Sequence, residues 1–310
     1  MRRLLVICGP TASGKTALAV ELAERLGAEI VSADSQQCYR GLDAGTAKPT
    51  PEEQARARHH LLDVADPEEQ LDAARFVQLA DAAIADIAAR GKPAIVAGGT
   101  GLWIRALLRG LLEAPGASPT FRAALRQEFH KLGVPALHAR LATLDPEAAA
   151  RILPNDRVRI ERALEVHALS GKPLSTLQRE HGFAEARYQA LIWFLDPPRE
   201  TLRERIEART RRMFADGGLR RETGWLLGRG AVKALKIIGY GECAEALRTG
   251  DWALAEERTR ARTWRYAKRQ RTWFAKDAGP PLDWPFDAVR LCQVARGWYE
   301  GAPAADAQRE

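Results

Sequence analysis

The sequence predicts an α/β fold: a parallel sheet flanked by helices, with an all-helical insertion domain. Three observations carry this prediction. Short apolar runs rich in β-formers alternate with helical patterns over the first hundred residues. A glycine-rich motif separates the first predicted strand from the first helix. Helical patterns alone then follow one another from about residue 114 to residue 187, which interrupts the alternation.

The first part of the core is predicted from apolar runs and helix stop signals. The run of residues 4–8 reads as a buried strand, and residues 15–26 follow as a helix that Gly27 ends. Residues 29–32 and 94–97 are two further strands, with a helix over residues 71–89 between them. This order is typical of an open α/β sheet.

The insertion begins where proline and glycine break the pattern at residues 114–119. Helices are predicted over residues 119–132, 135–143, 146–152 and 156–169, with Asp145 capping the third and Pro146 at its first position. A strand over residues 189–195 returns to the core, followed by helices over 199–214 and 251–274. We therefore assign residues 1–113 and 188–310 to the core and 114–187 to the insertion, and expect the tail beyond Gly301 to lack structure.

Composition excludes several classes of protein. The longest uncharged run has 12 residues, too short for a membrane helix, which needs about 20. The four cysteines form no C-x-x-C pair, so we expect reduced thiols and a cytoplasmic protein without a membrane partner. The 47 basic residues outnumber the 40 acidic ones, a net charge of +7 that suggests a polyanionic partner only if the charge is clustered.

One motif predicts an anion site of the P-loop NTPase-like type. The sequence GPTASGKT, residues 9–16, fits G-x-x-x-x-G-K-[ST] and lies between a predicted strand and a predicted helix. Its backbone N–H groups and the helix N-terminus favour a diphosphate, Lys15 neutralises phosphate oxygens, and the Thr16 hydroxyl is placed to hold Mg²⁺. The motif leaves open whether that diphosphate belongs to a nucleotide.

Asp34 is the carboxylate expected beside this loop. A kinase or nucleotide hydrolase normally ends a nearby strand with a metal-binding Asp, but residues 94–101 contain no carboxylate. Asp34 follows the second strand instead, among uncharged hydrogen-bonding side chains. It could hold Mg²⁺, cap the turn or accept a proton from a substrate amine, and these residues alone do not choose among the three.

The turn Gly98-Gly-Thr-Gly101 lies at the carboxyl end of its strand, where open α/β sheets bind ligands. Thr100 is the functional candidate there, and a tight turn that needs positive φ is the alternative. The adjacent His59 and His60 do not resemble a metal pair, so we expect surface or hydrogen-bonding roles for them.

The positive charge is clustered near the C-terminus. Seven basic residues and no acidic one lie between Arg258 and Arg271, interleaved with aromatic side chains. On a helix, Arg258, Arg262, Arg265 and Arg269 share one stripe, as expected of a surface that follows a phosphate backbone. A solvated basic helix face with aromatic core residues is the alternative.

Nine motifs in a fixed order resemble the tRNA dimethylallyltransferase family over about residues 4–274. They are GPTASGKT (9–16), DSQQCY (34–39), GTAKP (45–49), HHLLD (59–63), GGTGL (98–102), NDR (155–157) with RALEV (162–166), SGKP (170–173), IGY (238–240) and AKRQ (267–270) with TW (272–273). Together they are far more specific than the P-loop alone.

The resemblance implies a reaction and a catalytic set. A dimethylallyl group would pass from dimethylallyl diphosphate to N6 of adenosine 37, next to the anticodon, in tRNAs that read codons beginning with U. Asp34 corresponds to the general base, Thr100 to a threonine at the reaction centre and Arg209 to the arginine facing the departing diphosphate. Mg²⁺ would be the cofactor, and the enzyme is expected to be a monomer.

The resemblance also implies which residues bind the two substrates. Gly9, Pro10, Thr11, Ala12, Ser13, Gly14, Lys15 and Thr16 would hold the diphosphate, with Thr16 at the metal. The anticodon stem-loop of tRNA would contact Asp34, Ser35, Gln36, Gln37, Thr100, Arg122, Val158, Arg159, Ile160, Glu161, Arg162, Lys236, Ile237, Ile238, Gly239, Tyr240, Gly241, Lys268, Arg269, Gln270, Arg271, Thr272, Trp273, Phe274 and Ala275. The target adenine must leave its stack to react, and the insertion would grip the stem.

Three features depart from the family pattern. Trp103 stands where Tyr is usual, and the segment 228–236 is short, with Lys236 in place of an arginine. The C-terminal zinc finger of eukaryotic relatives is absent, which indicates a bacterial-type enzyme.

Three rival functions use fewer of these features. A prenyltransferase acting on free adenine nucleotides has little use for a basic helix or a large insertion. The strand over residues 94–97 disfavours a small-molecule kinase, and a non-catalytic RNA-binding protein leaves the P-loop unexplained.

Overall fold

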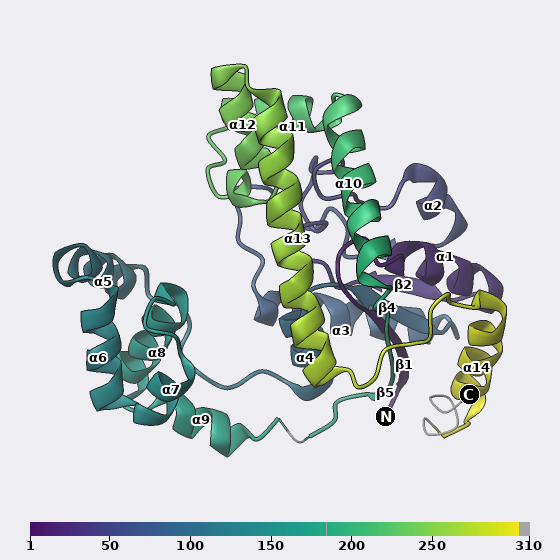
Figure 1. The fold of residues 1–310 in the computed structure, drawn as a ribbon. Helices are drawn as coiled ribbons and strands as arrows, with labels where there is room; N and C mark the ends of the chain where they lie inside the picture. The colour runs from purple at the N-terminus through teal and green to yellow at the C-terminus, as the bar shows by residue number, and fades with distance from the viewer. Residues whose placement is uncertain (184, 304–310) are drawn as a thin grey trace. The chain divides into compact units, whose positions relative to one another are not determined.

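The computed structural model describes residues 1–183 and 185–303. The chain divides into two compact units, Met1–Leu108 with Arg187–Glu310, and Arg109–Ala186 (Figure 1). The sequence pattern places the insertion at residues 114–187, so its start differs by a few residues. Residues 304–310, most of the tail expected to lack structure, lie outside the described part.

The first unit is built on a parallel five-stranded sheet in the order β3-β2-β4-β1-β5. Its strands are β1 (Arg3–Cys8), β2 (Glu29–Ser32), β3 (His59–His60), β4 (Ala94–Gly98) and β5 (Gln189–Phe194). Its helices are α1 (Lys15–Leu26), α2 (Pro51–Arg56), α3 (Ala73–Ala89), α4 (Gly101–Arg109), α10 (Arg199–Ala215), α11 (Gly218–Gly228), η1 (Ala234–Lys236), α12 (Tyr240–Thr249), α13 (Trp252–Asp277) and α14 (Ala288–Glu300). The P-loop strand β1 therefore lies between β4 and β5.

Alternate side chains of β1 enter two different cores. Leu4 and Val6 pack with residues of α3 and α4 on one face of the sheet. Leu5 and Ile7 pack with residues of α1 and α14 on the other. Both faces are covered, which is why β1 reads as a continuous apolar run rather than an alternating one.

Helices α10, α11, α12 and α13 pack against one another beside this sheet (Figure 1). The Asp251 side chain caps α13 by accepting from the Leu254 N–H. Tyr240 and Leu219 form a small core with Leu42, from the loop between β2 and α2. This packing brings the second half of the chain to the carboxyl ends of β1 and β2.

In its described residues, 109–183 and 185–186, the second unit contains helices and no strand. They are α5 (Pro119–Leu132), α6 (Val134–Leu144), α7 (Pro146–Arg151), α8 (Arg157–Ser170) and α9 (Leu174–His181). Asp145 caps α7 as predicted, accepting from the Ala148 N–H, and its carboxylate also binds Ser175. Leu125, Leu141 and Ile160 lie in its core.

The structure confirms the α/β class and the four predicted strands, and it adds the two-residue strand β3. It also adds the helices α2, α4, α9, α11, α12 and α14 to those that the sequence predicts. All four cysteines are free and buried. Within residues 1–183 and 185–303, no helix is long and apolar enough to cross a bilayer.

Candidate active site at the carboxyl ends of the strands

The loop between β1 and α1 has the backbone of an anion cradle. Gly9, Ala12 and Gly14 all have positive φ, at 151°, 65° and 97°. A Cβ on Gly9 would lie 2.3 Å from the Leu195 carbonyl oxygen, so only glycine fits where the loop passes the end of β5. The Ser13 hydroxyl is buried and has no hydrogen-bond partner in the described part of the chain. A loop with these features is suited to bind the oxygens of a diphosphate.

Lys15 begins α1 and lies over the loop. Its Nζ donates to the Pro10 carbonyl at 2.6 Å. Burial lowers the pKa of Lys15 to about 8, against the opposing effect of Asp34 and with a smaller lowering by Arg209. The loop thus holds a cation that lacks a full counter-charge, which favours an anionic ligand.

Asp34 lies just beyond the end of β2. One carboxylate oxygen, Oδ1, accepts the Gln36 N–H at 2.9 Å, so Asp34 does cap its turn. Its Oδ2 receives no hydrogen bond or ion pair from residues 1–183 and 185–303. One oxygen is therefore fixed, and the other remains for a substrate.

Thr100 joins the ends of β4 and β2. Its N–H donates to the Ala33 carbonyl at 3.1 Å, and its Oγ1 accepts the Ser35 N–H at 2.9 Å. The hydroxyl also donates to Ser35 Oγ at 3.2 Å. A Cβ on Gly98 would lie 2.2 Å from the Ala33 carbonyl oxygen. Gly98 therefore serves close backbone approach, while Gly99 and Gly101 leave room for the side chains of Gln270 and Trp273. The alternative of a turn needing positive φ was wrong, since none of the three glycines has it.

Arg209 reaches the P-loop from α10. Its guanidinium donates from Nη1 to Thr11 Oγ1 at 2.8 Å and from Nη2 to the Thr46 carbonyl at 3.0 Å. Burial lowers the pKa of Arg209, while the nearby Asp34 opposes that shift. The structure thus brings together Lys15, Asp34 and Arg209, three residues that are far apart in the sequence.

Gln270 of α13 clamps the two glycine-rich segments together. Its amide oxygen accepts the Thr11 N–H at 2.8 Å, and its amide nitrogen donates to the Gly99 carbonyl at 2.8 Å. The side chain is 6% exposed. The resemblance places Gln270 among the tRNA contacts, but its amide is occupied by protein backbone.

Tyr266 is a site residue that the sequence does not identify. Burial, followed by the charge of Asp34, raises the pKa of the Tyr266 hydroxyl. The available signal is its position four residues before Gln270 on one helix face. That spacing has no meaning until the partners of Gln270 are known.

The basic side chains of α13 fall into two groups, those that are exposed and those that form ion pairs with acidic residues. Arg258, Arg265, Lys268 and Arg269 are exposed. Arg262 instead binds Glu242 at 2.5 Å and the Lys236 carbonyl, and Arg271 binds Asp196. Arg262, on the same stripe as the exposed arginines, is therefore committed to an ion pair, and contact of the stripe with a phosphate backbone stays a prediction. Trp264 has Arg199 and Lys268 against its ring.

Besides Gln270, three predicted tRNA contacts have buried side chains. Ile160, Tyr240 and Phe274 are 0%, 0% and 2% exposed, so neither their side chains nor their backbone is open to a ligand in this structure. Arg122 and Arg162 bind the buried Glu165, which holds their guanidinium groups in place.

Other predicted tRNA contacts are open to solvent. Val158 is 78% exposed, and Arg159 and Lys236 are exposed as well. Contact of this group with tRNA stays a prediction.

Trp103 and the histidine pair lie beside the site. Trp103 is buried and stacks on Phe76 with ring centroids 4.4 Å apart, so it belongs to the core under α3. His60 hydrogen-bonds the Glu29 carboxylate, and His59 the Ala57 carbonyl, which confirms hydrogen-bonding roles. The part of the chain that the structure describes holds no cluster of three or more metal-ligating His, Cys, Asp or Glu side chains.

Comparison with known proteins gives one consistent set of matches. A family model described as IPP transferase matches residues 37–277. The chain is 58% identical over 290 residues to the tRNA dimethylallyltransferase of Anaeromyxobacter dehalogenans (strain 2CP-C), covering 91% of this chain and 96% of that one.

Solved structures agree with this match. The full-length tRNA isopentenylpyrophosphate transferase from Bacillus halodurans is 34% identical, with a TM-score of 0.70 and both chains fully covered. A eukaryotic dimethylallyltransferase, described as acting on tRNA, is 25% identical with a TM-score of 0.83, covering 98% of this chain and 81% of that one.

Proposed function

The chain belongs to the IPP transferase family, and from that premise we propose that it moves a dimethylallyl group from dimethylallyl diphosphate to N6 of adenosine 37. It is an enzyme that transfers a prenyl group to tRNA. The nucleotide next to the anticodon, in tRNAs reading codons that begin with U, is the proposed acceptor. We expect the enzyme to act as a monomer in the cytoplasm.

The observation that carries this proposal is the convergence of Lys15, Arg209 and Asp34 at the P-loop. Two cations beside a cradle of backbone N–H groups suit a diphosphate. The neighbouring strand β4 ends in Gly98-Gly-Thr100 and supplies no metal-binding carboxylate of the kind that kinases use. A diphosphate that departs whole fits this site better than one that is cleaved.

The donor set also fits a shared Mg²⁺ ion. Protein sites for Mg²⁺ usually provide one or two ligands and leave the rest to substrate phosphates and water. The Thr16 hydroxyl lies in the first turn of α1, and the orphaned Ser13 hydroxyl adds a second polar oxygen in the loop. When bound, the ion would offset part of the negative charge on the leaving diphosphate.

The reaction exchanges one bond for another. The N6–carbon bond forms as the allylic carbon–oxygen bond breaks, the electron pair of that bond leaves with the diphosphate, and the N6 proton passes to Asp34. We assign this proton to Oδ2, the oxygen that the turn does not use. Because the N6 lone pair is delocalised into the ring, it attacks well only as the proton leaves.

Arg209 and Lys15 act on the departure of the diphosphate. Negative charge accumulates on the bridging oxygen as the bond breaks, and donors already aimed at that position stabilise the transition state. Arg209 is held at Thr11 before any substrate arrives, so little reorganisation is required. Thr100, fixed by Ser35, would position the reacting groups between the two halves.

Exposed cations suit the tRNA backbone. Arg258, Arg265, Lys268 and Arg269 lie on α13, whose buried Gln270 reaches the P-loop. The same helix would thus link contact with RNA phosphates to the catalytic loop. Free adenine nucleotides have no phosphate backbone to use these cations, and the curated relatives are named for tRNA.

The experiment compares two acceptors side by side. The purified protein with Mg²⁺ and labelled dimethylallyl diphosphate should transfer label to unmodified tRNA and not to AMP. Transfer to AMP with none to tRNA would contradict the proposal.

A further inference from the structure

We propose that Glu222 of α11 is a positioning residue for Arg209 and acts through the loop of residues 42–48. The inference rests on the proposed role of Arg209 at the diphosphate. Within residues 1–183 and 185–303, neither Glu222 nor this loop hydrogen-bonds the P-loop directly. The effect must therefore pass through the loop backbone to Arg209.

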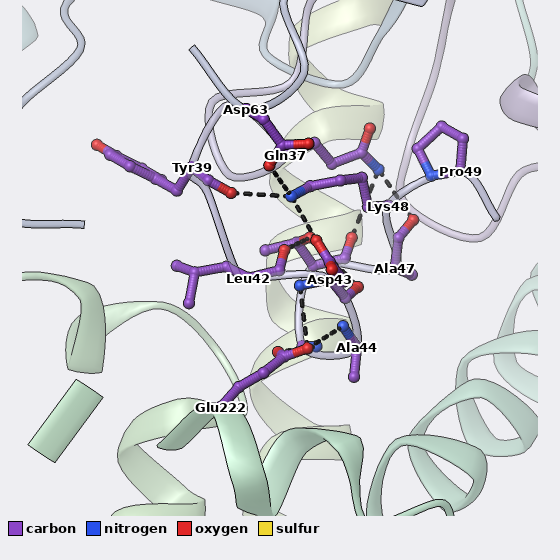
Figure 2. A network of polar contacts seen from close by, with 12 residues as sticks. Gln37, Tyr39, Leu42, Asp43, Ala44, Ala47, Lys48, Pro49, Asp63 and Glu222 are labelled. Carbon is purple, nitrogen blue, oxygen red and sulfur yellow. Dashed lines mark hydrogen bonds and ion pairs between the residues drawn. The ribbon is translucent and has the colours of Figure 1, made fainter. Parts of the chain in front are cut away.

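Glu222 binds the loop by its N–H groups. Its Oε1 accepts from the Asp43 N–H at 3.1 Å and the Ala44 N–H at 2.7 Å, and its Oε2 accepts from the Gly45 N–H at 3.2 Å (Figure 2). One carboxylate thus satisfies three successive donors. A charged acceptor makes such hydrogen bonds stronger than neutral ones.

A second contact fixes the carboxylate itself. The Tyr240 hydroxyl donates to Glu222 Oε2 at 2.5 Å, and the Tyr240 side chain is 0% exposed. A Cβ on Gly45 would lie 2.3 Å from the Tyr240 ring, so the loop backbone packs directly on this ring. The GTAKP and IGY motifs therefore form one structural unit around Glu222.

The loop is also tied down on its other side. Lys48 Nζ donates to the Tyr39 carbonyl at 2.9 Å and to the carboxylates of Asp43 and Asp63 at 2.5 and 2.6 Å (Figure 2). The preceding Ala47 has a φ of 48°, which a non-glycine residue rarely adopts. Such a conformation persists only where its surroundings hold it.

The constrained loop presents a backbone carbonyl to the active site. Arg209 Nη2 donates to the Thr46 carbonyl at 3.0 Å, while Nη1 reaches Thr11. Gln37, one of the predicted tRNA contacts, donates from Nε2 to the adjacent Ala47 carbonyl at 3.0 Å. A shift of residues 43–45 would therefore move the acceptor that orients Arg209.

The test begins with Glu222→Gln. The amide keeps one acceptor oxygen but replaces the other with a donor, which cannot accept the Gly45 N–H. We expect single-turnover prenyl transfer at saturating substrates to fall about 10-fold or more, since a misplacement of ~1 Å can cost about 10²-fold. Thermal unfolding and tRNA affinity are measured alongside it. Glu245→Gln, whose side chain pairs on the surface with Arg248, is the matched control and should transfer at the wild-type rate.

A double-mutant cycle with Arg209→Ala separates positioning from general damage. If Glu222 acts through Arg209, the Glu222→Gln loss should largely disappear in the Arg209→Ala background. The same fold-loss in both backgrounds would overturn the inference while leaving the role of Arg209 intact. Wild-type transfer by Arg209→Ala would overturn the proposed role of Arg209 and the inference with it.

Tyr240→Phe gives a second route if Glu222→Gln does not fold. It removes only the hydroxyl and keeps the ring against Gly45. A smaller loss of transfer, again absent in the Arg209→Ala background, is the expected result. Additive losses would contradict the inference.

Discussion

Arg209 donates to the Thr11 hydroxyl across 2.8 Å, although the two residues are 198 positions apart in the sequence. The P-loop comes from the first strand–helix unit of the core, and Arg209 comes from the helix that follows the last strand. The proposed diphosphate site is therefore complete only when both halves of the core have folded together. Because the proposed proton acceptor, Asp34, and the proposed diphosphate cations, Lys15 and Arg209, are different residues, mutation can separate their effects.

Asp34→Asn should abolish proton transfer while leaving the turn in place. The asparagine oxygen can still accept the Gln36 N–H, but the amide cannot take a proton from N6. We expect the transfer rate to fall by about 10²- to 10⁴-fold, the usual contribution of a general base, with tRNA affinity little changed. Gel-shift and single-turnover measurements on one preparation check both. Parallel losses of affinity and rate would instead make Asp34 an RNA-positioning residue.

Affinity for diphosphate should decrease as the pH rises above about 8, the lowered pKa of Lys15. Binding an anion favours the protonated lysine, so the affinity is fully present below that pKa and is lost above it, by about 10-fold per pH unit. A phosphate ester, with its second pKa near ~6, no longer changes charge in this range. Calorimetry with dimethylallyl diphosphate, whose diphosphate is esterified, at pH values on either side of the Lys15 pKa, measures the slope.

Lys15→Arg is the control for that slope. Arginine keeps its charge throughout this range, so its affinity should vary little with pH even if it is weaker overall. An unchanged slope in the variant would show that another group titrates.

Gln270→Leu should weaken diphosphate binding rather than tRNA binding. It leaves the Thr11 N–H and the Gly99 carbonyl without their partner, at a cost of about 1–3 kcal/mol in the free energy of unfolding. Lys268→Gln, on the exposed side of the same helix, is the matched variant. It should weaken tRNA binding rather than diphosphate binding. If Gln270→Leu loses tRNA affinity and keeps pyrophosphate affinity, Gln270 is a tRNA contact and the clamp is unimportant.

Gln270 also illustrates what a sequence can and cannot predict. The strands at residues 4–8 and 94–97 were predictable because buried parallel strands are continuous apolar runs. His59–His60 carries no such signal, and β3 was missed. The contacts of Gln270, and three of those of Glu222, end on backbone atoms, which no residue pattern reveals. Side-chain motifs predicted the candidate active site, and tertiary packing revealed the residues that hold it in place.

The number and spacing of the basic residues on α13 were predictable from the sequence, but their ion-pair partners were not. Helical spacing places Arg262 on the same stripe as Arg258 and Arg265, yet it forms an ion pair with Glu242 of α12. Only the partner helix decides which arginines stay free.

The salt dependence of tRNA binding should depend on the exposed arginines of α13 and little on the ion-paired Arg262. Substituting Arg258, Arg265 and Arg269 with Gln should reduce the slope of log affinity against log salt by about 0.7–0.9 for each phosphate that the variant no longer neutralises. Arg262→Gln should lower thermal stability and change the slope little, because it breaks the pair with Glu242. Equal slopes in the triple variant and the wild type would make α13 an ordinary solvated helix.

Locating the transferred group tests the proposed reaction most directly. Unmodified tRNA with adenosine at the nucleotide next to the anticodon is incubated with Mg²⁺ and labelled dimethylallyl diphosphate, and its nucleosides are separated by mass. We predict one labelled product, N6-isopentenyladenosine, and none from the same tRNA with guanosine at that position. Label at another nucleotide, or equal label in the guanosine tRNA, would contradict the proposed function.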